Sequence, residues 1–183
     1  MKSTQSRFEI ENSYYVFFVM VIMESMRAFN VLGTIGVLAI MASDLLISVT
    51  SAHETLVLPY MLGLVLGQCF LGMLSDRYGR MVVFIVVLNI YAVSTLISNF
   101  INDLFLLSLF RLFSGLTSAI GQITVRALVN DFCDLKVGGV ILSKVRCVAL
   151  LITGISMFFF EYIGLLHGWR SFFILNTIYC CIV

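Results

Sequence analysis

Charged side chains are scarce in this chain of 183 residues. Only 11% of the residues are Asp, Glu, Lys or Arg, whereas 61% are hydrophobic, and a typical soluble chain has about 25% charged residues. A soluble domain of this composition would expose many apolar side chains to water, whereas lipid solvates them without penalty. The scarcity of charge therefore excludes a water-soluble globule and indicates a membrane protein.

The charges that are present almost cancel. There are 11 basic and 10 acidic residues, so the formal net charge is +1. A chain without an excess of basic residues has no long-range field that attracts a polyanion. We therefore expect no nucleic-acid partner.

Histidine is rare, and the cysteines follow no pattern. The chain has two histidines and five cysteines, with no C-x-x-C, no H-E-x-x-H and no carboxylate-histidine cluster. These patterns are what zinc sites and many hydrolases require. The sequence therefore predicts no metal, no cofactor and no enzymatic activity. We interpret the cysteines as small hydrophobic residues; they are Cys69, Cys133, Cys147, Cys180 and Cys181.

Long apolar runs dominate the rest of the sequence. A helix needs about 20 residues to cross roughly 30 Å of hydrocarbon, and a lipid-exposed backbone must satisfy its own hydrogen bonds, which favours helices. Five runs are long enough, whereas a sixth run, 171–183, would form only about 20 Å of helix. We expect an all-α membrane protein, a single transmembrane bundle over 1–183 with five full spans and a partial sixth. The full spans are 14–36, 56–74, 81–100, 104–125 and 147–166.

Basic residues are unequally distributed about these spans. One side of the membrane holds eight of them and the other holds only Arg170. Because basic flanking residues stay in the cytoplasm, we expect a multi-pass protein of the inner (plasma) membrane with a cytoplasmic amino terminus. Loops near 37–55, 101–103 and 167–170 should lie outside. The eight residues are Lys2, Arg7, Arg77, Arg80, Arg126, Lys136, Lys144 and Arg146.

A charged turn separates the second and third spans. The segment from Gly72 to Arg80 reads G-M-L-S-D-R-Y-G-R and fits the pattern G-x-L-x-D-R-x-G-R. We expect Gly72 to allow close helix approach and Gly79 to permit a tight reversal. Asp76, Arg77 and Arg80 gather three charges at the interface. An ordinary cytoplasmic hairpin with flanking arginines is the alternative.

This motif resembles the cytoplasmic loop signature of the major facilitator superfamily of secondary transporters. The segment R-L-F-S-G, which begins at Arg111, resembles the fourth-span signature of that family. The segment V-R-A-L-V-N-D, which contains Arg126 and Asp131, resembles the cytoplasmic end of the same span in drug:proton antiporters. The segment G-W-R-S-F-F, from Gly168, resembles the start of the sixth span in that branch, which includes the bicyclomycin and chloramphenicol resistance exporters.

The resemblance implies proton-coupled export of drugs or small molecules, with the lipid bilayer, a small-molecule substrate and H⁺ as partners. Two features depart from the family pattern: Met81 replaces the usual Lys or Arg, and the segment 153–161 lacks the Gly-Pro-rich signature of antiporters. The family has about twelve spans in two halves. We therefore expect an amino-terminal half that is inactive without a complementary carboxy-terminal half. The alternatives are a half-size transporter acting as a homodimer and a membrane interaction protein that transports nothing.

Four charged residues fall inside the predicted spans, where each costs about 2.5–3.5 kcal/mol on insertion scales. They are Glu24, Arg27, Arg111 and Glu161, and we interpret Glu161, near the outer end of the fifth span, as a boundary residue. Glu24 and Arg27 are three residues apart, so we expect an ion pair that faces a cavity. If its surroundings alternate between wet and dry, Glu24 could bind the coupling proton; a static ion pair is the alternative. Arg111 matches an arginine that the family associates with proton transfer or substrate binding, and the alternative is a side chain that reaches out to the interface.

The charge bias makes the orientation testable. In a cysteine-labelling scan, cysteines at Ser75 and Lys136 should react only with a reagent in the cytoplasm, and a cysteine at Thr50 only with a reagent outside, because basic flanking residues are retained inside. Labelling of the Ser75 position from outside would overturn both the orientation and the placement of the charged turn.

Overall fold

The computed structural model describes residues 13–132 and 135–182, and the side chains of 16–131 and 137–181. Within these residues the secondary structure is helical and contains no strand, so the predicted all-α class is confirmed. Lys2, Arg7, Cys133 and the side chain of Lys136 lie outside the described part of the chain.

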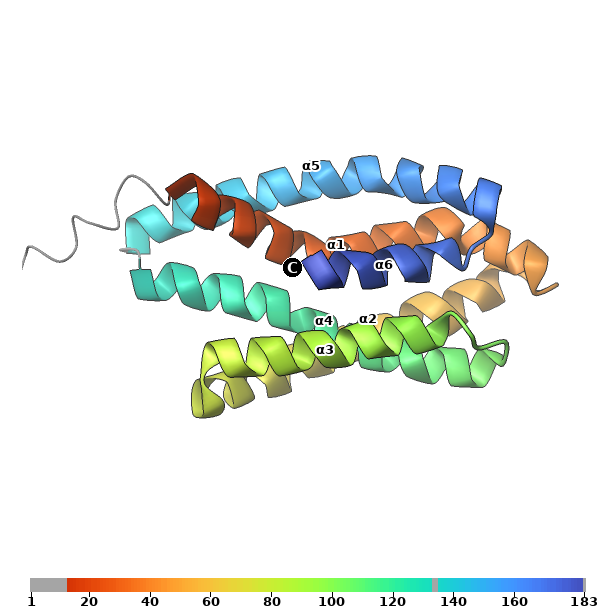
Figure 1. The fold of residues 1–183 in the computed structure, drawn as a ribbon, viewed down its shortest axis with the longest axis horizontal. Coiled ribbons are helices and arrows are strands. Elements are labelled where there is room, and N and C mark those ends of the chain that lie inside the picture. The colour runs from red at the N-terminus through yellow and green to blue at the C-terminus, as the bar shows by residue number, and fades with distance from the viewer. Residues whose placement is uncertain (1–12, 133–134, 183) are drawn as a thin grey trace, which may run out of the picture.

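The described residues form six helices, and Figure 1 shows how they are arranged. Five are long and apolar enough to cross a membrane, whereas the last has only 12 residues. This confirms the predicted five full spans and partial sixth. The helices are α1 (Ser13–Asp44), α2 (Val49–Tyr78), α3 (Arg80–Ser98), α4 (Leu104–Phe132), α5 (Leu135–His167) and α6 (Ser171–Ile182).

The predicted outer loop at 37–55 is wrong in extent. Helix α1 continues to Asp44, and α2 begins at Val49, where the hydroxyl of Ser48 accepts a hydrogen bond from the backbone N–H of Ser51 at 3.1 Å. With 32 residues, α1 is about 48 Å long. A fall in hydropathy marks where the chain leaves the hydrocarbon, not where a helix ends. Helices α1 and α2 are both longer than the roughly 20 residues that cross the hydrocarbon.

The most extensive helix contacts join α2 to α4 and α1 to α5, and α3 also packs on α4 and α6. In Figure 1, α1, α5 and α6 lie together, as do α2, α3 and α4. If the first three helices are exchanged in order with the last three, so that α2 takes the place of α5 and α4 that of α1, the α2–α4 contact becomes the α5–α1 contact. The two main contacts are therefore equivalent. This pattern is typical of a bundle built from two three-helix repeats.

Glycines allow these helices to approach closely. A Cβ atom on Gly63 would overlap the backbone carbonyl of Leu112, and one on Gly115 would overlap that of Tyr60. In the equivalent α1–α5 contact, a Cβ on Gly36 would lie 2.9 Å from the carbonyl oxygen of Met157. Small residues at such contacts let backbones pack together in lipid, where no hydrophobic force drives helices to associate.

The two glycines of the charged turn differ in role. Gly79 has a φ of +93° and joins α2 to α3, which confirms the predicted reversal. A Cβ on Gly72 would meet nothing within 4 Å, so the predicted close helix approach at Gly72 is not present among the described residues. The position lies off the buried stripe of α2 that contacts α4.

The turn between α2 and α3, the carboxyl end of α4 and the amino end of α5 lie at the same end of the bundle, which we call the basic end (Figure 1). Five basic side chains are described near it, and Arg170 lies at the opposite end. Ser75 is buried there, with 2% exposure. The exposed Asn130 is therefore a better labelling position at the basic end than Ser75.

The α2–α4 contact can be tested with two alanine substitutions. Gly63→Ala should lower the thermal unfolding midpoint in detergent, because the new methyl group overlaps the Leu112 backbone; the expected cost is about 1–3 kcal/mol. Gly72→Ala makes the same change on the same helix in open space. It should leave the midpoint equal or slightly higher, since alanine favours helix. Equal midpoints for the two variants would contradict the packing described here.

Candidate functional site

A pocket of about 300 Å³ opens between α1, α2, α4 and α5, in the half of the bundle nearer the basic end. We call it the polar pocket. It brings together three of the residues singled out in the sequence, Glu24, Arg27 and Arg126. The complete lining is Glu24, Arg27, Ala28, Gln68, Gln122, Arg126, Arg146, Ala149 and Leu150.

Glu24 is held by one carboxylate oxygen. The side chain is 4% exposed. Its Oε1 accepts a hydrogen bond from Nε2 of Gln122 at 3.2 Å and lies 3.5 Å from Nε of Arg146. Gln122 in turn accepts a hydrogen bond from Nε2 of Gln68 at 3.4 Å. Oε2 of Glu24 is buried and has no partner among the described residues, which leaves one oxygen available for a proton.

The backbone explains why Gln122 reaches Glu24. A Cβ on Gly121 would overlap the backbone carbonyl of Met23. Because Gly121 has no side chain, α4 can lie directly against α1 at this level. The next residue on each helix then comes within hydrogen-bonding distance of the other.

The ion-pair partner of Glu24 differs from the prediction. Arg146 of α5 forms the salt bridge, whereas Arg27 forms none with any described carboxylate. Spacing along one helix cannot reveal a partner on another helix, and α5 packs closely against α1. The sequence interpretation treated Arg146 only as a flanking basic residue. Its place directly before the apolar run at 147–166 is the signal that it could enter the membrane region.

Arg111 is buried in the bundle interior, apart from the lining of the polar pocket. It is 1% exposed, which rules out the alternative of a side chain that reaches out to the interface. Its Nη2 donates to Oγ1 of Thr34 at 2.8 Å, and its Nη1 lies 3.5 Å from Oδ1 of Asn30. The guanidinium also lies 4.7 Å from the ring centre of Phe173 and 5.2 Å from that of Phe172. A cation over aromatic faces is stabilised electrostatically.

A buried polar network extends from Arg111. Asn30 also donates hydrogen bonds to Tyr91 and, at 3.2 Å, to Oδ1 of Asn176. The hydroxyl of Tyr91 donates to the same oxygen of Asn176 at 3.3 Å. The network thus joins α1, α3, α4 and α6. Sequence reasoning did not find Asn30 and Asn176, although a single asparagine within a long apolar run was a usable signal, because buried amides require partners.

The charged turn is connected to the end of the fourth span. Arg80 forms a salt bridge with Asp131, so two groups that the sequence suggested separately meet at the basic end. Arg77 lies 5.5 Å from the ring centre of Tyr78, and Asp76 is exposed. Exposed ion pairs stabilise by about 1 kcal/mol or less. The Arg80–Asp131 pair therefore matters more for fixing the position of α3 relative to α4 than for overall stability.

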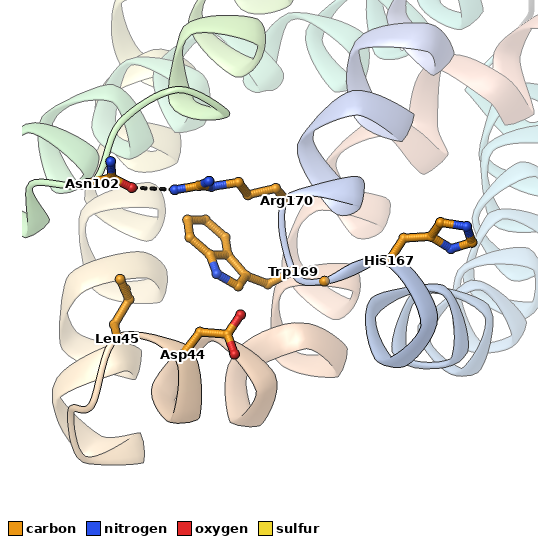
Figure 2. A pocket seen from close by; sticks show the side chains of 7 residues that line it. Asp44, Leu45, Asn102, His167, Trp169 and Arg170 are labelled. Carbon is orange, nitrogen blue, oxygen red and sulfur yellow. Dashed lines mark hydrogen bonds between the residues drawn. The ribbon is translucent and has the colours of Figure 1, made fainter.

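A second pocket, of about 440 Å³, lies at the opposite end (Figure 2). Arg170 donates a hydrogen bond to Asn102 and lies 5.2 Å from the ring centre of Trp169. Figure 2 shows the ring of His167 pointing away from Asp44. No cluster of three potential metal ligands occurs among the described residues. We interpret this pocket as the corner that fixes the α5–α6 turn against the loop before α4.

In a comparison with known families, the family model of the Major Facilitator Superfamily matches residues 16–183. A comparison with curated proteins finds no match. The matched range includes every residue of the polar pocket and of the buried polar network around Arg111.

The buried charge of Arg111 leads to a stability prediction. Arg111→Met should give folded protein with an unfolding midpoint at least equal to that of the wild type. No described carboxylate compensates the arginine, and apolar replacements of buried charges are often neutral or stabilising. Lys144→Met, at an exposed position, is the control for loss of one positive charge. Size-exclusion profiles and thermal unfolding measure both variants, and loss of folded Arg111→Met protein would instead assign Arg111 a structural role.

Proposed function

We propose, from the premise that this chain belongs to the Major Facilitator Superfamily, that it takes part in proton-coupled transport of a small molecule. Five apolar helices of membrane-spanning length make it a multi-pass integral membrane protein of a transporter family. The proposal concerns the coupling ion, the substrate and the residues that carry them.

The environment of Glu24 is the observation that carries the proposal. An acidic side chain with 4% exposure is costly in a membrane protein and is by default a candidate functional residue. Arg146 and Gln122 hold one of its oxygens, the other is buried without a hydrogen-bond partner among the described residues, and the side chain lines the polar pocket. Glu24 can therefore take a proton on Oε2 without losing the contacts that position Oε1.

Export of drugs or other small molecules by exchange with protons is the finer form of the proposal. It rests on the resemblance of two segments to the drug:proton antiporter branch, namely those that begin at Val125 and Gly168. The missing Gly-Pro-rich signature in α5 is the feature that weakens it. Arg111 is the proposed coupling residue, because its network reaches three other helices.

The remaining residues have proposed mechanical roles. Asp76, Arg77 and Arg80 would form a cytoplasmic latch, with Asp131 as the partner of Arg80. The basic end would face the cytoplasm, as the distribution of basic residues predicts. In this family a substrate site lies between two halves that move against each other. We therefore propose a complementary carboxy-terminal half as the partner of this bundle.

Glu24→Gln provides the main test. In cells that lack other exporters, with a related carboxy-terminal half co-expressed, the variant should abolish efflux driven by a pH gradient, because an amide cannot exchange the proton. The amount of membrane protein should remain near normal, since the side chain of Arg146 is 43% exposed and is not left buried without a partner. Drug accumulation and quantitative immunoblotting measure the two quantities.

Glu161→Gln is the matched control. This carboxylate lies on α5 at an exposed position, so its replacement should leave efflux unchanged. Normal efflux in the Glu24→Gln variant, at normal abundance, would refute the proton-binding role. A fall in abundance alone would show that Glu24 serves only as a structural counter-charge.

A further inference from the structure

The polar pocket contains more positive than negative charge. Arg27, Arg126 and Arg146 line it together with one carboxylate, Glu24. The salt bridge engages Arg146 with that carboxylate. Among the described side chains, Arg27 and Arg126 have no acidic partner. Two uncompensated guanidinium groups therefore line one pocket.

Arg27 provides an independent sign of a missing ligand. Its Nε atom is buried and has no hydrogen-bond partner among the described residues. Buried donors in folded proteins are nearly always paired, and an unpaired one requires an explanation. The same side chain lines the pocket, so a ligand held by the Arg27 guanidinium is the explanation that the pocket offers.

The rest of the lining suits a small organic molecule. Gln68 and Gln122 contribute amide groups, whereas Ala28, Ala149 and Leu150 contribute apolar surface. Six of the nine lining residues are polar or charged, so the pocket suits a strongly polar molecule that has a small apolar part. A volume of about 300 Å³ accommodates a molecule the size of a single substituted ring.

We propose that the polar pocket binds a small organic anion, with its carboxylate or phosphate group held by Arg27 and Arg126. Planar guanidinium groups bind such oxygens in a bidentate manner, and the positive field of the pocket disfavours a cation. This inference rests on the proposed function and narrows its substrate class. The phosphate of an anionic lipid carries the same chemistry, so the experiment must distinguish a soluble anion from a head group.

The test measures equilibrium binding of four ring-sized probes. The full chain is reconstituted into nanodiscs of phosphatidylcholine, and calorimetry measures binding of benzoate, phenyl phosphate, benzylammonium and benzyl alcohol. The two anions should bind at least about tenfold more tightly than the cation and the alcohol, because only they form charge-assisted hydrogen bonds with arginine. Equal or tighter binding of benzylammonium would overturn the proposal.

Substitutions locate the binding. Arg27→Gln and Arg126→Gln should each weaken anion binding about tenfold or more. Lys144→Gln removes one positive charge from an exposed position on α5 that does not line the pocket, and it should leave binding unchanged. If a glutamine variant does not fold, Arg27→Lys and Arg126→Lys keep the charge but lose the planar fork, and they should still weaken binding. Unchanged binding in the arginine variants would refute the assignment.

Two further outcomes separate the hypotheses. If nanodiscs that contain phosphatidylglycerol abolish binding of the anionic probes at a salt concentration that screens the surface charge, the pocket holds a lipid head group and the substrate assignment is wrong. Binding is measured without a proton gradient, so it does not depend on transport. Anion binding without Glu24-dependent efflux would therefore refute the proposed function alone, whereas Glu24-dependent efflux without anion preference would refute only this inference.

Discussion

Backbone contact at glycine is the constraint on which the rest of this bundle depends. Hydrocarbon does not drive helices together, so close packing must supply the attraction. Gly63 and Gly115 bring α2 against α4, and Gly121 brings α4 against α1. Helix α4 is thereby fixed on two sides at once. These contacts set the rotation and the height of α4, and they therefore determine the direction of its polar side chains, including Gln122.

The sequence was sufficient for the number and type of elements. Lipid forces spanning segments to be helical and apolar, so composition alone locates them, and the reversal at Gly79 follows from a glycine at a charged turn. The ends of the helices were harder to predict. We expected a loop over 37–55, but this region begins with the apolar run V-L-A-I-M-A. It is mostly helical, because a helix that leaves the hydrocarbon can keep its backbone hydrogen bonds in water.

The sequence singled out candidate residues of the polar pocket but not their pairings. Glu24 is a candidate because it is a carboxylate inside an apolar run, whereas its partners lie on α4 and α5. Nothing in the local pattern around Arg146 specifies that contact. Gly72 shows the converse error, since a glycine in a family motif suggested close packing that the described residues do not contain. Partners on distant helices depend on helix rotation, which the hydropathy pattern does not determine.

The Glu24–Arg146 salt bridge also has a consequence for biosynthesis. More than one hundred residues separate the two partners in the chain, and synthesis proceeds at about 5–20 residues per second. For roughly ten seconds, α1 therefore exists without its main packing partner and without the counter-charge of Glu24. The most extensive contacts join the first three helices to the last three, so neither triplet completes its packing without the other. Until α5 arrives, water or a protein partner beside α1 would have to compensate the charge of Glu24.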